Sequence, residues 1–244
     1  MNSEKLVRLR LTLLFFLLAG TAFAQKPSRR EYLVTISTKF GAIPLVLHDQ
    51  TPQHKANFLK LVRQKYYDGL LFHRVIEQFM IQGGDPNSRT AAAGQRLGEG
   101  SIGYTVPAEF RPELFHRKGA LAAARDNNPA KASSGNQFYL VQGKAWTTEA
   151  ELERQIARSG RPFTEAQKQV YRTEGGTPHL DGNYTVFGQA LGGFAVIDRI
   201  ARQPRDPANR PLQDVRMTIS AKKMARKKIT RRYGYQWPSA TQNP

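Results

Sequence analysis

A single arginine, Arg74, stands among large apolar residues in the segment LFHRVIEQFMIQGGDP, which covers residues 71–86. Phe79, Met80 and Gln82 follow it in the same segment. If the segment forms two strands around a turn, strand alternation places Arg74, Met80 and Gln82 on one surface, with Phe79 at its edge. A guanidinium held over an apolar floor is a strong, oriented hydrogen-bond donor. The pattern therefore indicates either a pocket with a charged donor or two ordinary strands with Arg74 exposed.

Other common chemistries find little support in the sequence. The chain has no cysteine, which excludes disulfide scaffolds, thiol enzymes and metal sites built from cysteine. Its 5 histidines show no HxH or HExxH spacing, so we expect no metal site and no cofactor. Ser133 lies in a polar turn, and the sequence identifies no base for it, so acyl transfer is not expected either.

The elements that must position Arg74 are mostly strands. Residues 31–38 alternate, and Gly41 leads into a second apolar stretch over 43–47, which predicts a hairpin. Thr51 followed by Pro52 predicts the start of a helix that continues to Asp68-Gly69. Short apolar runs broken by Gly, Pro, Asn and Asp then continue to about residue 140, as is typical of a β-barrel or sandwich. Further along we expect a strand at 184–188, a short helix at 194–201 and a last strand at 215–220.

Residues 143–178 interrupt this strand pattern. Thr148 with Glu151, and Thr164 with Gln167, match the capping box that begins a helix. Gly160 and Gly175-Gly176 supply helix stops. The segment therefore predicts an inserted helical hairpin.

The N-terminal 24 residues have the pattern of a secretory signal peptide. Three basic residues precede an apolar run that begins at Leu11 and ends in Ala22-Phe23-Ala24. The run is too short for a comfortable membrane span and suits a signal peptide, although an uncleaved anchor is the alternative. We expect cleavage after Ala24, export to the periplasm, and a short polar lead over residues 25–30 before the folded domain at 31–220.

Residues 221–244 are basic and contain no acidic residue, within a chain whose net charge is +18. Such a segment could bind nucleic acid or an anionic membrane surface. We expect instead a flexible, solvated tail with at most weak contact with an anionic surface. No nucleic-acid partner is expected for an exported protein.

The segment at 71–86 resembles the signature of the cyclophilin-type peptidyl-prolyl isomerases almost residue for residue. The resemblance covers residues 31–220 and continues downstream in GYTVPAEF at 103–110, GALAAAR at 119–125, SGNQFYL at 134–140 and LDGNYTVFG at 180–188. It implies a mainly β fold, a closed eight-stranded antiparallel β-barrel capped by two helices, to which this chain adds the helical insert.

The resemblance also implies roles for individual residues. Arg74 maps to the catalytic arginine of the family. The substrate-binding positions map to Phe79, Met80, Gln82, Ala124, Arg125, Gln137, Tyr139, His179, Leu180 and Tyr184. Three of them depart from the usual residue: Tyr139 replaces Phe, His179 replaces the Trp of many eukaryotic members, and Tyr184 replaces their His. The changes at His179 and Tyr184 bear on cyclosporin affinity, whereas the isomerase chemistry is expected to remain.

The implied activity is rotation about Xaa-Pro bonds in unfolded or flexible proline-containing polypeptides, by a monomer that assists protein folding. A module that recognises proline without accelerating rotation is the alternative, and the presence of Arg74 argues against it. The insert ends directly at His179, on the rim of the expected groove, so it either selects clients or is a tolerated surface insertion.

Overall fold

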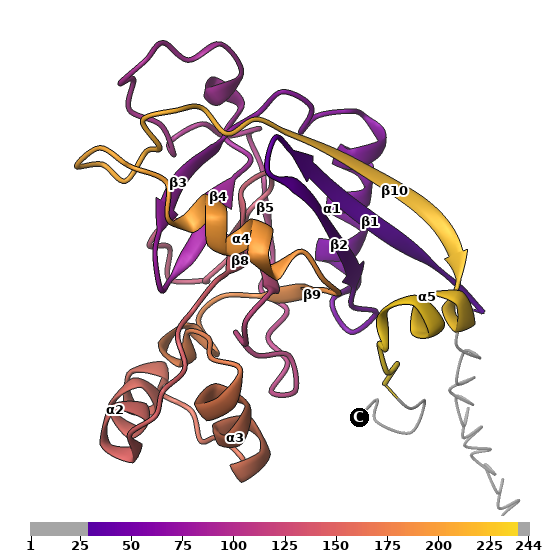
Figure 1. Ribbon diagram of the computed structural model, residues 1–244, viewed down its shortest axis with the longest axis vertical. Coiled ribbons are helices and arrows are strands. Elements are labelled where there is room, and N and C mark those ends of the chain that lie inside the picture. The colour runs from indigo at the N-terminus through magenta and orange to yellow at the C-terminus, as the bar shows by residue number, and fades with distance from the viewer. Residues whose placement is uncertain (1–28, 239–244) are drawn as a thin grey trace, which may run out of the picture.

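The computed structural model describes residues 29–238, and its centre is one eight-stranded antiparallel sheet (Figure 1). The strand order is β10-β1-β2-β9-β6-β8-β4-β3. Backbone hydrogen bonds connect the two ends of the sheet next to its outer strands: Gly69 N–H, just before β3, donates to Met217 O of β10, and Phe72 N–H of β3 donates to Val215 O, just before β10, both at 2.9 Å. The sheet thus closes on itself, which confirms the predicted barrel. Its strands are β1 Arg30–Thr38, β2 Gly41–Leu47, β3 Phe72–Ile76, β4 Met80–Gly83, β6 Ala120–Ala123, β8 Phe138–Val141, β9 Val186–Ala190 and β10 Met217–Ala225, and a separate pair consists of β5 Thr105–Val106 and β7 Ser133–Ser134.

Strand alternation divides the apolar residues of β4, β6 and β8 between two clusters. Phe138 and Leu140 of β8 point into the main core inside the barrel, whereas Tyr139 and Val141 belong to a second cluster on the outer face. The same division holds for Ile81 and Met80 on β4. These strands are therefore buried on both faces, because the outer face carries an apolar surface of its own.

Two helices cover the barrel core, as predicted. The helix α1, Pro52–Arg63, buries Phe58, Leu59, Leu61 and Val62, and α4, Phe194–Ala201, buries Ile197, Ile200 and Ala201. The helix α1 ends earlier than the predicted stop at Asp68-Gly69. Lys65 adopts a positive φ of 57°, which turns the chain out of the helix and places Tyr67 in the core.

The start of α1 is held by a residue that the sequence pattern did not indicate. Thr51 makes no side-chain hydrogen bond to the helix N-terminus; its hydroxyl donates instead to His48 O at 3.4 Å. The buried carboxylate of Glu109 accepts the backbone N–H groups of Gln53 and His54 at 3.1 and 3.0 Å. A carboxylate at this position satisfies free N–H groups and complements the helix dipole.

We expect Glu109→Ala to lower the free energy of unfolding by about 3 kcal/mol, because two backbone donors and the His54 ring lose their acceptor. Thr51→Ala removes only a long hydrogen bond and is expected to cost below about 1 kcal/mol. Urea denaturation of both variants checks the pair, and a larger loss in Thr51→Ala would contradict the assignment of Glu109 as the cap.

The predicted insert is a hairpin of α2, Glu149–Ser159, and α3, Glu165–Thr173, which projects from the barrel (Figure 1). Only one of the two predicted helix caps is present. The capping box at Thr164 and Gln167 is present, whereas Thr148 makes no side-chain cap. After α3, the chain continues through a single turn of 3₁₀ helix, η2 Pro178–Leu180, and a second such turn, η1 Pro86–Thr90, follows β4.

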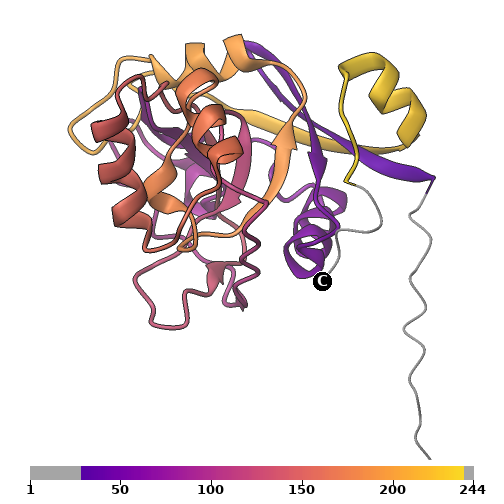
Figure 2. The same cartoon turned by 90° about the horizontal axis from the view of Figure 1, so that it is seen from below.

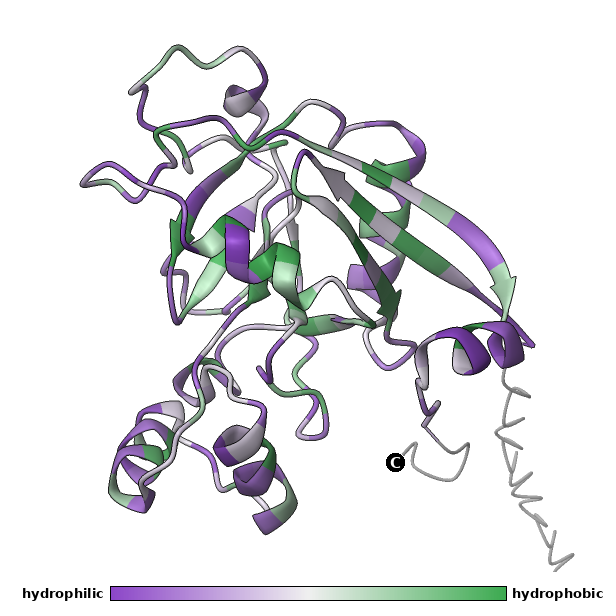
Figure 3. Ribbon diagram, in the orientation of Figure 1, coloured by the Kyte–Doolittle hydropathy of each residue, from purple (hydrophilic) through white to green (hydrophobic). Residues whose placement is uncertain are grey.

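The predicted flexible tail is wrong for residues 221–238, because the structure gives them a fold. The strand β10 continues to Ala225, and α5 follows over Arg226–Tyr233 (Figure 2). Ile229 is fully buried against Leu33 and Val46 on the outer face of β1 and β2. Arg226 forms ion pairs with Glu31 at 3.4 Å and Asp49 at 2.5 Å. The composition of α5 is mostly hydrophilic (Figure 3), and Ile229 is its one buried residue, so the sequence of the helix gives little sign of this contact.

We expect Ile229→Ala to lower the free energy of unfolding by about 2–5 kcal/mol, the usual cost of truncating a fully buried isoleucine. Lys228→Ala, an exposed change on the same helix, is the matched control and is expected to leave stability unchanged. Equal stability of the two variants in chemical denaturation would instead support the flexible tail that the sequence predicts.

The predicted signal peptide lies at residues 1–24, outside the described residues. Between residues 29 and 238, no helix is long and apolar enough to cross a membrane.

Candidate active site

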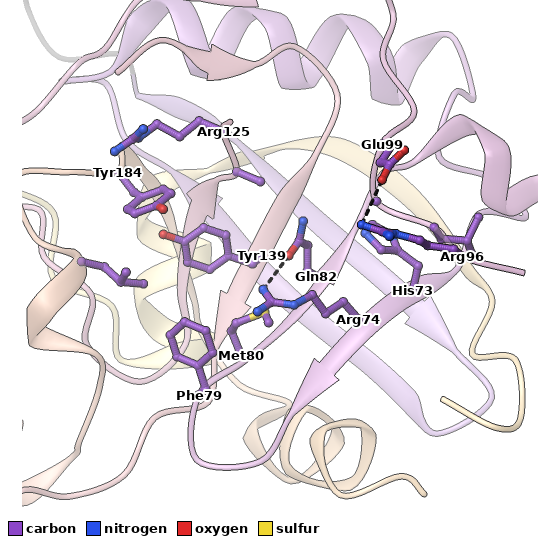
Figure 4. A pocket seen from close by; sticks show the side chains of 14 residues that line it. His73, Arg74, Phe79, Met80, Gln82, Arg96, Glu99, Arg125, Tyr139 and Tyr184 are labelled. Atoms are coloured by element: carbon purple, nitrogen blue, oxygen red, sulfur yellow. Dashed lines mark hydrogen bonds and ion pairs between the residues drawn. The ribbon is translucent and has the colours of Figure 1, made fainter. Parts of the chain in front are cut away.

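Arg74 and Gln82 face each other across the β3-β4 hairpin. The two residues are register partners, and Arg74 Nη1 donates to Gln82 Oε1 at 3.2 Å (Figure 4). Gln82 Nε2 donates in turn to Gln137 Oε1 at 3.0 Å, and Gln137 Nε2 donates to the carbonyls of Gly98 and Gly100. The amides are therefore oriented along one direction, so that Gln82 presents an oxygen and not an N–H to the guanidinium. Burial lowers the pKa of Arg74, but arginine stays charged at neutral pH.

An apolar floor lies beside this guanidinium, on the outer face of β4 and β8. Met80 and Tyr139 are almost fully buried, and the partly buried Phe79 and Leu180 pack against them (Figure 4). The neighbouring strand β6 contributes only small side chains to this face, including Ala122, which leaves room above the sheet. The result is a cavity of about 330 Å³, within the range of small-ligand sites.

Phe79 is fixed from behind, both through its backbone and through its ring. Its carbonyl accepts the N–H groups of Gln142 and Gly143 at 3.0 Å. Its ring stacks on that of His179, with centroids 5.7 Å apart and an interplanar angle of 24°. Burial lowers the pKa of His179 to about 4, so the ring is neutral at physiological pH. His179 thus supports the pocket wall from outside the cavity.

The rim opposite Phe79 consists of Arg125 and Tyr184. The Arg125 guanidinium lies 4.7 Å from the centre of the Tyr184 ring, and its Nε donates to Asn183 O at 2.8 Å. This side chain is therefore held along the rim. Ala124 and Arg125 border the cavity, where the resemblance expects a main-chain grip on the peptide.

Nine predicted site residues line the cavity, and two support it from outside. The lining residues are Arg74, Phe79, Met80, Gln82, Ala124, Arg125, Tyr139, Leu180 and Tyr184, and the supporting residues are Gln137 and His179. Sequence reasoning missed His73 and the loop at 96–99, which also line the cavity. In that loop, Arg96 and Glu99 form an exposed ion pair of 3.2 Å. No local pattern indicates that a glycine-rich loop folds over the hairpin at 71–86.

Ser133 does have a histidine partner, contrary to the sequence analysis. His54 Nε2 lies 2.9 Å from Ser133 Oγ, and His54 Nδ1 lies 2.7 Å from Glu109 Oε2. The arrangement resembles a hydrolase triad, but Ser133 is only 1% exposed. Its hydroxyl is therefore closed to substrate, and the group joins α1 to β7.

The comparisons with known proteins agree with this geometry. The model of the family "Cyclophilin type peptidyl-prolyl cis-trans isomerase/CLD" matches residues 33–221. The chain therefore belongs to the cyclophilin-type peptidyl-prolyl cis-trans isomerases.

Individual relatives support the same family. A protein of Staphylococcus haemolyticus, provisionally named a peptidyl-prolyl cis-trans isomerase, is 37% identical over 76% of this chain and 88% of its own length. A provisionally named bifunctional phosphatase/peptidyl-prolyl cis-trans isomerase of Streptococcus pyogenes is 42% identical, but the match spans only 37% of that protein. The crystal structure of a Cryptosporidium parvum cyclophilin-type isomerase, 25% identical, covers 79% of this chain and 98% of its own with a TM-score of 0.58.

Proposed function

We propose that the chain accelerates rotation about Xaa-Pro bonds with Arg74 as the catalytic donor. Rotation of a peptide bond has a barrier of about 18–20 kcal/mol, because resonance resists twisting. Twisting localises the lone pair on the prolyl nitrogen. A donor that reaches this nitrogen only in the twisted state stabilises the transition state and not the ground state. No bond has to break, so the site needs a donor, a grip on the ring and a grip on the flanking peptide.

The single observation that carries the proposal is the position of the Arg74 guanidinium at the edge of the apolar floor of the cavity. Gln82 engages Nη1 at 3.2 Å, and a guanidinium has five N–H donors, so the remaining ones are available to substrate. The apolar floor of Met80, Phe79, Tyr139 and Leu180 suits a proline ring, which has no donor to satisfy. With the ring held, rotation is confined to the bond on its N-terminal side.

The experiment is prolyl cis/trans exchange in a short Xaa-Pro peptide, measured by NMR line shape with catalytic amounts of purified protein. We expect exchange faster than the uncatalysed rate, whose time constant is about tens to hundreds of seconds. Peptide binding without acceleration would favour the alternative, a module that recognises proline-containing chains.

The clients are proposed to be exported polypeptides that contain proline, on which the protein acts as a monomer that assists folding. The support is the signal-peptide pattern that precedes the domain and the absence of cysteine, which spares the fold any dependence on redox conditions. Cell fractionation with N-terminal sequencing tests this part. A mature protein that begins at Gln25 in the periplasmic fraction is expected, and a cytoplasmic protein that retains residues 1–24 would overturn it.

A further inference from the structure

The floor of the cavity is connected to the helical insert by a chain of buried hydrogen bonds. The hydroxyl of Tyr139 lies 2.9 Å from His116 Nε2, and His116 Nδ1 donates to Asp181 Oδ1 at 2.6 Å. The other oxygen of Asp181 accepts the Tyr171 hydroxyl at 2.7 Å and Arg161 Nη2 at 3.0 Å. Tyr171 lies on α3, and Arg161 lies in the turn between α2 and α3. This series of hydrogen bonds therefore runs from the floor of the cavity to the helical insert.

The network is buried except at Arg161, whose side chain is 18% exposed. His116 and Tyr171 are 0% exposed, Asp181 is 1% exposed, and Tyr139 is 4% exposed. Asp181 also accepts the backbone N–H of His116 at 2.8 Å, which fixes the ring relative to its own main chain. A carboxylate only accepts, so His116 Nδ1 carries a proton toward Asp181, and the Tyr139 hydroxyl, which can both donate and accept, is the partner of Nε2. The rings of His116 and Tyr139 also stack, with an interplanar angle of 14°.

The hydroxyl of Tyr139 makes this network necessary. A phenylalanine at this position needs no partner, whereas a buried tyrosine hydroxyl without one carries a desolvation cost. A Tyr139 ring that lost His116 would have to move to find another partner, and the ring borders the cavity. The position of His116 therefore bears directly on the width of the proline pocket.

The insert reaches the pocket by a second, covalent connection. The chain leaves α3 through Gly175-Gly176 and enters η2, whose last residue, Leu180, lines the cavity. Asp181 follows Leu180 directly. Gly176 packs so closely that a Cβ there would lie 2.2 Å from His116 O. The anchoring of Asp181 by the insert thus also holds Leu180 in place.

From this network we infer that His116 is a positioning residue for the isomerase and that the insert, through Tyr171, Arg161 and Asp181, fixes the shape of the proline pocket. The insert is then part of the substrate-binding apparatus and not a tolerated surface addition. The inference rests on the proposed function, since it assigns the cavity to a proline ring.

A double-mutant cycle between His116 and Tyr139 tests this inference. The measured quantity is the dissociation constant of an Ala-Pro-containing peptide, determined by NMR titration and independent of turnover. We expect His116→Leu to weaken binding about tenfold when Tyr139 is present, the effect of one buried hydrogen bond, and less than about twofold in the Y139F background. Equal factors in the two backgrounds would overturn the inference, because His116 would then act on the fold alone.

A second pair of variants covers the case in which His116→Leu does not fold. Tyr171→Phe removes one hydroxyl at the far end of the network, and we expect about two- to threefold weaker binding with Tyr139 present and a smaller loss, through Leu180 alone, in the Y139F background. Lys168→Ala is the matched control on α3, because it removes ion pairs to Glu149, Glu153 and Glu165 without touching Asp181. It is expected to leave the dissociation constant unchanged, and a change as large as that of Tyr171→Phe would overturn the inference.

Failure of the proposed function gives a different result. A protein that binds the peptide without accelerating exchange overturns the isomerase mechanism, yet the cycle still reports the coupling between His116 and Tyr139. A protein that binds no Ala-Pro peptide overturns both.

Discussion

Arg74→Ala is expected to lower kcat/KM for prolyl isomerisation by about 10²- to 10³-fold, the usual cost of removing one preorganised donor from a transition state. The structure supports a loss of rate of this size because Gln82, itself held by Gln137, keeps the Arg74 guanidinium in one orientation at the edge of the cavity. The measurement is catalysed cis/trans exchange in a short Xaa-Pro peptide. Peptide affinity is expected to change far less than the rate, since the donor acts only in the twisted state.

Two further variants make this result specific. Arg74→Lys retains the charge but loses the planar, multiple donors, so we expect it to recover only a small part of the rate. Arg154→Ala on α2 removes the same charge at an exposed position and is expected to leave the rate unchanged. A loss below about threefold in Arg74→Ala would exclude Arg74 as the catalytic residue.

Acidification from pH 7 to pH 4 is expected to lower the free energy of unfolding by several kcal/mol through two buried histidines. Burial lowers the pKa of His48 and of His73 to about 4, from an ordinary value of 6.5. Below pH 6.5 each ring takes up a proton in the unfolded chain but not in the folded protein, so the unfolded state gains stability. The loss from each histidine grows down to about pH 4 and reaches about 3 kcal/mol.

His73→Leu tests one of these two contributions. Within residues 29–238, neither ring nitrogen of His73 has a hydrogen-bond partner, so an apolar residue loses no polar contact there. Urea denaturation between pH 7 and pH 4 is expected to show a loss of stability about 3 kcal/mol smaller in His73→Leu than in the unmodified protein. Parallel curves for the two proteins would mean that His73 does not titrate in this range. A loss of stability that begins only below pH 4 would assign the acid sensitivity to carboxylates such as Asp181. Although burial raises the pKa of Asp181, hydrogen bonds from His116 and Tyr171, together with the charge of Arg161, lower it overall.

Features that depend on local pattern were predictable from the sequence. Alternation around Arg74 correctly placed Met80 and Gln82 beside it, because a hairpin with a short turn fixes which residues face each other. The insert was predictable for the same reason, since Thr164, Gln167 and the glycines that end its helices act over a few residues. The resemblance to cyclophilins supplied the more distant members of the site.

Features that depend on partners far apart in the chain were not predictable. Glu109 caps the start of α1 in place of Thr51, although it lies 55 residues beyond His54 in the chain, and nothing near Pro52 indicates it. The sequence predicts a flexible tail because residues 221–244 are rich in charge. The packing of the tail depends instead on the contact of Ile229 with Leu33 and Val46, which lie far from it in the chain. The contact between His116 and Tyr139 is of this kind as well, since an isolated histidine gives no signal of what it supports.

The pairing of the first strand with the last has a consequence for the timing of folding. All nine residues of β1 pair with β10, from Arg30 opposite Ala225 to Thr38 opposite Met217, and Arg226 closes the same edge onto Glu31, 195 residues away. Loops of this length close slowly and raise the contact order of the fold. Residues 30–38 can therefore pair with β10 only after nearly the whole chain has emerged from a ribosome or from a translocation channel. An incomplete chain retains an open strand edge, and that edge is where we expect a chaperone or a second unfinished chain to pair.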